Sequence, residues 1–251
     1  MKHFPTLSKI STTICALLIM SACSSDEAEE SNALIFNFSV KVDNEILIFG
    51  SKKYVTPSQQ QVSFDRIEFY LSNIQLKDAN SNIVYTEPDS YHLVSFDADH
   101  LTASITVEGV PSEIEIAELL MAIGVDAEAN ASIDHVGDLD PTNGMAWDWN
   151  TGYKFFLMDG RYFDKDDPLG EEIKMHIGTD KNYFVMSQVF SEPFSIVGDF
   201  TLGYSVDAMA PIGDLDFDQG TVFMNDERGD QVADNYKNAL LILEETFGFI
   251  K

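Results

Sequence analysis

Short runs in which apolar and polar residues alternate constrain the fold of this chain most strongly. This two-residue period recurs over residues 34–40, 67–71 and 105–107. Because successive side chains of a strand point to opposite faces of a sheet, the alternation predicts strands with one buried face. Asp43-Asn44 and residues 78–82 lie between apolar runs and are typical of hairpin turns. The expected fold class is therefore all-β, an antiparallel β-sandwich.

A long loop and a C-terminal helix are the expected additions to this sandwich. Residues 115–125 are predicted to form a buried strand, and a loop over residues 127–150 follows. A loop of that length in a compact domain is usually functional. Further strands are expected over 153–158, 173–177, 183–190 and 199–207. Apolar residues from Val232 to Phe247 follow helical spacing, so a helix is expected there, with Asp230 as its cap and Gly248 after its end.

The N-terminus has the layout of a bacterial lipoprotein signal. Two lysines precede an apolar stretch over residues 14–20, which is too short to span a bilayer, and Cys23 follows small residues. A plain signal peptide with an incidental cysteine is the alternative. We expect residues 1–22 to be the signal, 23–33 an acidic tether that begins at the acylated Cys23, and 34–251 one domain. Membrane contact is then expected through the lipid anchor only.

Cysteine usage and charge exclude several classes of function. Cys15 leaves with the predicted signal and Cys23 carries the lipid, so thiolate enzymes, zinc ribbons and iron–sulfur clusters are excluded. The chain has 42 acidic residues against 15 Lys and Arg, a formal net charge of −27. Such a field repels phosphate, so no nucleic-acid partner is expected. No nucleophile elbow, phosphate loop or metalloprotease helix is present, and the chain is not expected to be an enzyme.

Both tryptophans of the chain, Trp147 and Trp149, lie two residues apart inside the long loop. In an extended backbone their rings, and the thioether of Met145, point to one face. On the residues alone, a hydrophobic plug under the loop is the favoured interpretation, and a binding or redox role is the alternative. A polar loop would leave the rings accessible to an external electron acceptor, and nearby aspartates would stabilise a tryptophan radical cation.

Four histidines follow the predicted signal: His92, His100, His135 and His176. Imidazole is a common ligand for copper and zinc. His92 and His176 lie in strand-like segments between apolar residues, where a lone histidine is more often a hydrogen-bonded core residue than a ligand. His100 and His135 are expected to be solvated, with His135 as a spare ligand because it lies near the tryptophans in sequence.

An ordered set of segments resembles the MbnP-like family of copper-associated bacterial envelope proteins. The similar segments are residues 69–74, 91–94, 122–126 with Asn130, 139–153 and 176–178. The resemblance covers roughly Leu34 to Phe190. It implies a β-sandwich, a periplasmic or cell-surface location, and copper held by histidines and an oxidised tryptophan. It also implies a partner dihaem enzyme, related to cytochrome c peroxidases, that oxidises the tryptophan to kynurenine.

These expectations combine into a copper-binding lipoprotein of a Gram-negative envelope, at the periplasmic face of the outer membrane or the cell surface. The expected metal site is His92, His176 and Trp147; the modified or supporting residues are Trp149, Met145, Asp126 and His135. Calcium is a second candidate ion, held by oxygens of Asp126, Asn130, Asp138 and Asp140, although carboxylates in turns more often accept backbone N–H groups. The alternative function is a non-metal adhesin or carbohydrate-binding sandwich with a stacking platform of Trp147, Trp149 and Tyr153.

Overall fold

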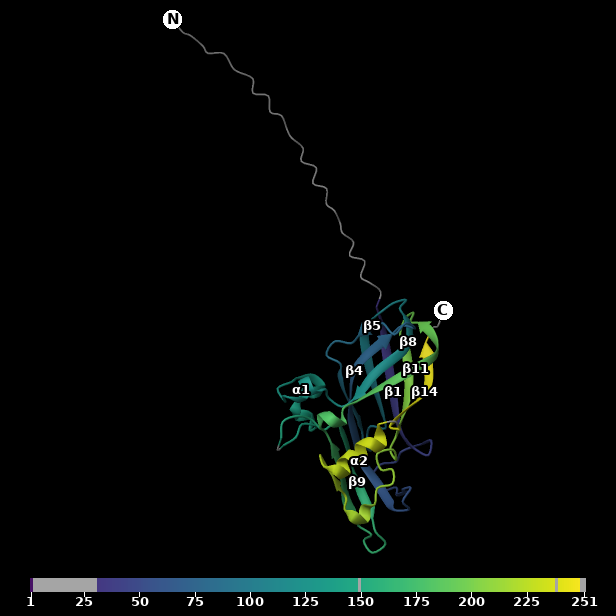
Figure 1. The fold of residues 1–251 in the computed structure, drawn as a ribbon, viewed down its shortest axis with the longest axis vertical. Coiled ribbons are helices and arrows are strands. Elements are labelled where there is room, and N and C mark those ends of the chain that lie inside the picture. The colour runs from purple at the N-terminus through teal and green to yellow at the C-terminus, as the bar shows by residue number, and fades with distance from the viewer. Residues whose placement is uncertain (2–30, 149, 238, 249–251) are drawn as a thin grey trace.

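The computed structural model describes Met1 and residues 31–248, apart from residues 149 and 238. Two sheets pack face to face, which confirms the predicted β-sandwich (Figure 1). The first strand begins at Ser31, three residues before the expected start of the domain at Leu34. Cys23, the predicted signal and most of the predicted tether lie outside the described residues.

The smaller sheet has five strands and is mixed rather than antiparallel. Its strands are β1 (Ser31–Val42), β2 (Glu45–Ile46), β7 (Thr102–Pro111), β12 (Phe200–Asp207) and β14 (Leu241–Gly248). β1 pairs antiparallel with β2 and β7 but parallel with β12. The purely antiparallel expectation was wrong here, because β1 and β12 are far apart in sequence and no tight turn fixes their relative direction.

The larger sheet has nine strands and is organised around one long strand. Its strands are β3 (Tyr54–Val55), β4 (Gln61–Lys77), β5 (Ile83–Thr86), β6 (Tyr91–Phe96), β8 (Glu115–Ile123), β9 (Phe156–Phe163), β10 (Glu171–Ile177), β11 (Phe184–Ser195) and β13 (Val222–Phe223). β4 pairs with β3, β5, β6, β8 and β9. The predicted turns at residues 43–44 and 78–82 connect β1 to β2 and β4 to β5.

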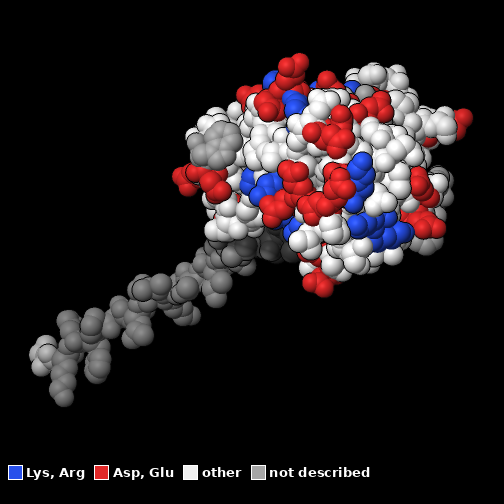
Figure 2. Space-filling model, turned by 90° about the horizontal axis from the view of Figure 1, so that it is seen from below, with Lys and Arg blue, Asp and Glu red and all other residues white. Residues whose placement is uncertain are grey.

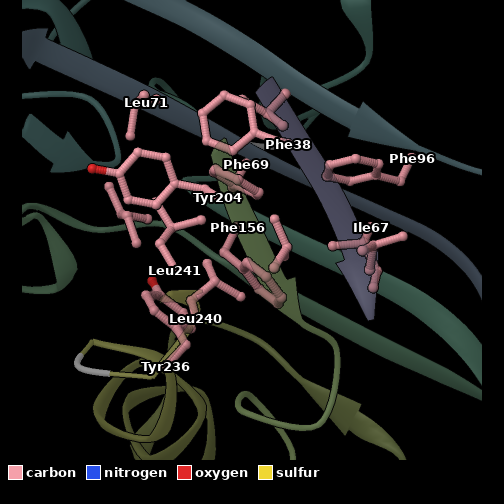
Figure 3. Packing of buried hydrophobic residues seen from close by; sticks show 14 of the residues in the cluster. Phe38, Ile67, Phe69, Leu71, Phe96, Phe156, Tyr204, Tyr236, Leu240 and Leu241 are labelled. Carbon is pink, nitrogen blue, oxygen red and sulfur yellow. The ribbon is translucent and has the colours of Figure 1, made fainter. Parts of the chain in front are cut away.

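The core lies between the two sheets and is rich in aromatic rings (Figure 3). Phe38 of the five-stranded sheet meets Phe69 of β4 edge-to-face, with ring centroids 6.4 Å apart. Phe38 also stacks on Tyr204 of β12 at 5.9 Å. Alternate residues of long strands such as β1, β4 and β12 supply this core, which is the arrangement that the two-residue period predicts.

Helices are few and short. They are α1 (Ala127–Asn130), α2 (Glu227–Tyr236) and the 3₁₀ helices η1 (Gly137–Leu139), η2 (Pro141–Asn143), η3 (Asp180–Asn182) and η4 (Phe217–Gln219). The long loop therefore contains three short helical segments. Across the described part of the chain, no helix has the length and apolarity that crossing a membrane requires.

The expected C-terminal helix was only partly right. It begins after Asp226, whose carboxylate accepts the N–H of Gly229 at 2.9 Å, and not at Asp230. It ends at Tyr236, and the residues expected to form its last turns belong to β14. β14 pairs with β12, so partners distant in sequence satisfy its backbone and override the local helical spacing.

The contact between Phe38 and Phe69 generates a stability prediction. Phe69→Ala leaves a cavity between the sheets and should lower the free energy of unfolding by about 3–5 kcal/mol. Val189→Ala is the control, because Val189 is 66% exposed on the edge strand β11 and its loss should change stability by less than about 0.5 kcal/mol. Urea unfolding followed by circular dichroism measures both. Equal midpoints for the two variants would contradict the assigned core.

Candidate functional site

The nine-stranded sheet has two chemically different faces. Its inner face, which packs on the smaller sheet, is apolar: Ile67 and Phe69 of β4 and Met175 and Ile177 of β10 point there. The residues between them point to the outer face. The register pairs Glu68 of β4 with Leu157 of β9, and Leu157 with His176 of β10, so these three side chains share the outer face.

The long loop covers part of the outer face with its own small core. This second cluster contains Tyr70, Val125, Ala129, Leu139, Met145, Tyr153, Phe155 and Leu157. The hydroxyls of Tyr70 and Tyr153 donate to the backbone oxygens of Asp138 and Leu139, at 2.9 and 2.7 Å. These bonds satisfy the polar tips of two buried rings and tie the loop to the sheet.

A hairpin carries Trp147 to the end of β10. The N–H of Trp147 donates to the oxygen of Gly152 at 3.0 Å, and Ala146 forms an isolated bridge with Tyr153. The next residues continue to the sheet, where the N–H of Phe155 donates to Ile177 at 2.6 Å. A side chain at Gly178 would place its Cβ 2.0 Å from the oxygen of Tyr153, so only glycine allows this approach.

Trp147 is buried, with an exposed fraction of 5%, which fits the hydrophobic plug favoured from the residues and corrects the alternative expectation of an accessible ring. The ring lies under the side chain of Lys154, whose Nζ is 5.6 Å from the ring centroid. Burial lowers the pKa of Lys154, and this effect outweighs the opposing influence of Asp148. Lys154 thus places a positive charge near this ring. Trp149 lies outside the described residues.

His176 belongs to a charged cluster on the outer face. Its Nε2 is 2.7 Å from Oδ1 of Asp159, whose Oδ2 accepts Nη2 of Arg66 at 2.8 Å. Arg66 also approaches Glu68 at 3.5 Å, too far for a good hydrogen bond, and Oε2 of Glu68 is buried without one. Burial raises the pKa of Asp159, but the hydrogen bonds from His176 and Arg66 outweigh burial and hold the pKa below its usual range.

His92 does not join this cluster. It shares the face of β6 with the core residues Val94 and Phe96, so it lies on the inner side of the sheet, opposite to His176. Its Nε2 is 2.9 and 3.0 Å from the two carboxylate oxygens of Glu87. The expected joint site of His92 and His176 therefore requires correction, because alternate pointing along paired strands separates the two rings.

His135 lies near both Tyr153 of the Trp147 hairpin and His92. The two histidines, with Asp89 and Asp138, line an open cavity of about 440 Å³ at the edge of β6. The Nε2 of His135 is 3.0 Å from the oxygen of Ala129, which leaves its Nδ1 without a hydrogen-bond partner among the described residues. This ring was expected to be solvated, and it is half-buried against Tyr153.

The other predicted ligands have structural partners. Met145 is fully buried in the loop core, where its side chain fills space. Asp126 caps α1 through Oδ1, and its Oδ2 accepts Tyr91 at 2.5 Å. The remaining calcium candidates also have hydrogen-bond partners. The side chain of Asn130 donates to Asp180 and accepts the N–H of Tyr153. Asp138 accepts the N–H of Leu93, and Asp140 caps η2. These contacts fit the turn and cap alternative to calcium binding.

The sequence interpretation missed Arg66, Glu68, Asp159 and Lys154. A signal was available, because Arg66 and Glu68 occupy outward positions of a strand whose inward residues are all apolar. Charged residues at these positions indicate that this part of the outer face carries a polar cluster and is not packed against apolar side chains of the loop. In Figure 2 acidic side chains cover more of the visible face than Lys and Arg do, and Lys and Arg gather in a few groups among them.

The charge pairing of Asp159 predicts a pH dependence of stability. A carboxyl whose pKa is lowered by folding stabilises the fold at pH values above its pKa in the unfolded chain, 3.8. This contribution disappears as the pH falls through the pKa in the folded protein. At about pH 6, Asp159→Asn should therefore have a free energy of unfolding about 1.5–3 kcal/mol below that of the parent, measured by urea unfolding. This difference in stability should narrow near pH 3. Asp99→Asn, at an exposed position, should match the parent at both values. A gap that is constant with pH would contradict the pairing.

Comparison with known proteins gives the context of this site. The MbnP family profile matches residues 31–237. A solved structure described as MbnP from Methylosinus trichosporium superposes with a TM-score of 0.54 and 15% identity, covering 80% of this chain and 83% of that one. This likeness supports the fold. No curated protein is significantly similar in sequence. The family match covers the larger sheet, the strands of the smaller sheet except β14, and the Trp147 hairpin, and the chain belongs to the MbnP family.

Proposed function

We propose that this chain is a copper-binding envelope protein that holds the metal at His176, beside Trp147, and catalyses no reaction itself. Membership of the MbnP family suggests a copper-associated function. One observation carries the choice of site: the hairpin of Trp147 is joined by backbone contacts to the end of the strand that bears His176. No other histidine among the described residues has such a connection to Trp147 in its backbone contacts.

The donors at this place suit copper in type. Asp159 holds the Nε2 of His176. The Nδ1 of His176 has no hydrogen-bond partner among the described residues and is therefore the ligand atom. Carboxylate–histidine pairs of this kind orient metal ligands in many proteins. Within the described ranges, no group of three or more His, Cys, Asp or Glu side chains is arranged to hold a metal. The imidazole of His176 is then the primary donor to copper, and conversion of Trp147 to kynurenine would add an amine nitrogen and a ketone oxygen as further donors that tighten binding.

The proposal predicts the ranking of histidine variants. His176→Ala should weaken copper binding by more than about a hundredfold, since even an outer-shell partner is worth 10–100-fold. His92→Ala should bind like the parent, because His92 lies on the inner side of the sheet. His100→Ala is the control, with a side chain that is 70% exposed. Titration against a competing chelator measures all three.

The reverse ranking would contradict the site at His176. If His92→Ala and His135→Ala lose copper while His176→Ala keeps it, the metal occupies the cavity that those two histidines line at the edge of β6. If no variant loses affinity, copper does not bind through any of these histidines. Each result can be assigned without reference to the oxidation state of Trp147.

Oxidation of Trp147 is the second part of the proposal. Protein from a host that also makes a dihaem, cytochrome c peroxidase-like enzyme should contain one kynurenine, and protein made without that enzyme should contain none. The peptide from Met145 to Tyr153 then becomes about 4 Da heavier, a covalent change visible by mass spectrometry. Fragmentation of that peptide should place the change at Trp147. An unmodified peptide from the host that makes the dihaem enzyme would contradict the oxidation of Trp147.

A lipid anchor at Cys23 completes the proposal and places the protein in the outer membrane of a Gram-negative envelope, facing the periplasm or the cell surface. Cys23→Ser should release the protein from the membrane fraction, because acyl chains are the proposed attachment. Immunoblots of membrane and soluble fractions measure this. A variant that still sediments with membranes after a salt wash would contradict the anchor.

The stacking-platform alternative has less support. A carbohydrate platform needs exposed ring faces, and Tyr153 is fully buried while Trp147 is 5% exposed. The hydroxyl of Tyr153 also donates to the backbone of Leu139, which fixes the ring inside the loop. We therefore favour copper over a carbohydrate ligand for this face.

A further inference from the structure

Lys154 holds a positive charge over the ring that the proposed function requires to be oxidised. Its Nζ is 5.6 Å from the centroid of the Trp147 ring and donates to the oxygen of Gly144 at 2.8 Å. Its backbone N–H donates to the oxygen of Met145 at 2.7 Å. Hydrogen bonds thus anchor the residue at both its backbone and its side-chain end. The ammonium is fixed relative to the indole.

The ammonium of Lys154 makes removal of an electron from the Trp147 ring less favourable. An ammonium is attracted to the face of a neutral indole, whose π system is negative. When the ring loses an electron, both partners carry positive charge and repel each other. The ring is 5% exposed, so water screens this repulsion less than it would at the surface. Lys154 therefore stabilises the reduced ring and destabilises the oxidised one.

The acidic groups nearby oppose this effect only in part. Asp148, Asp159 and Glu68 all act electrostatically on Lys154. Asp159 is already paired with Arg66 and His176, and Glu68 lies 3.5 Å from Arg66. The side chain of Asp148 is exposed, where solvent screens its charge. The earlier expectation that aspartates favour a radical cation at Trp147 is thereby reversed.

We infer that Lys154 is a control residue that keeps Trp147 reduced and restricts its oxidation to strong one-electron oxidants. The inference rests on the proposed function, in which Trp147 is the oxidised residue. In the first step, a high-potential acceptor takes one electron from the indole and is itself reduced by one. The indole is left as a radical cation beneath the ammonium. Weaker oxidants, which cannot overcome this repulsion, leave the ring intact.

The test measures the rate of that first step in metal-free protein. A Trp149→Phe background leaves Trp147 as the one tryptophan of the chain. Flash-quench photolysis generates tris(bipyridine)ruthenium(III), which takes one electron and becomes ruthenium(II), and transient absorption follows the tryptophan radical. Lys154→Met, which keeps the aliphatic length and removes the charge, should form the radical about tenfold faster or more.

Two controls separate local charge from other causes. Lys154→Arg keeps the charge and should react like the parent. Lys52→Met changes the net charge equally but removes an ammonium that lies 4.7 Å from the ring of Tyr54, so it should also react like the parent. Acrylamide quenching of Trp147 fluorescence reports exposure and should be the same in the parent and in Lys154→Met.

Equal radical rates in Lys154→Met and the parent would overturn the inference. A faster rate accompanied by a proportional rise in acrylamide quenching would also overturn it, because exposure would then be the cause. A faster rate in Lys52→Met would show an effect of net charge alone and would have the same consequence. Copper is absent throughout, so failure of the copper site at His176 is detected separately by the histidine titrations.

Discussion

The alternation of side chains along β4 is the constraint on which both layers of the molecule depend. This 17-residue strand pairs with five others, so its register fixes theirs. Its inward residues, such as Phe69, build the contact with the smaller sheet, and its outward residues, Arg66, Glu68 and Tyr70, support the charged cluster and the loop core. A register shift of one residue would exchange the two sets, burying charges and exposing aromatic rings.

The sandwich could be predicted from the sequence because its strands carry the alternation locally. Residues 34–40 and 67–71 lie in β1 and β4, and the strand chosen for residues 115–125 is β8. Strand direction could not be predicted in the same way, since the parallel pairing of β1 with β12 depends on partners far apart in sequence. The end of α2 was missed for the same reason, because pairing of β14 with β12 decides the state of residues that also fit helical spacing.

The site was predictable in residue type but not in grouping. The histidines and Trp147 stand out in the sequence, yet which of them share a face depends on the pairing of β4, β6, β9 and β10. That pairing separates His92 from His176 and brings β10 to the Trp147 hairpin. Burial of Trp147 fits the hydrophobic plug that the residues favoured, but its place beneath Lys154 could not be foreseen, because that contact depends on how the hairpin folds. A loop of turn-forming residues here encloses its own apolar core.

The central claim is that copper binds next to Trp147 on the outer face of the nine-stranded sheet. The most direct measurement is quenching of Trp147 fluorescence by copper(II) in the unoxidised Trp149→Phe protein, because a paramagnetic ion quenches an indole only at short range. The proposed site predicts saturable quenching that persists in His92→Ala and is abolished in His176→Ala. Copper that binds with the same affinity but leaves the fluorescence of Trp147 unchanged, or quenching that depends on His92 instead of His176, would contradict it.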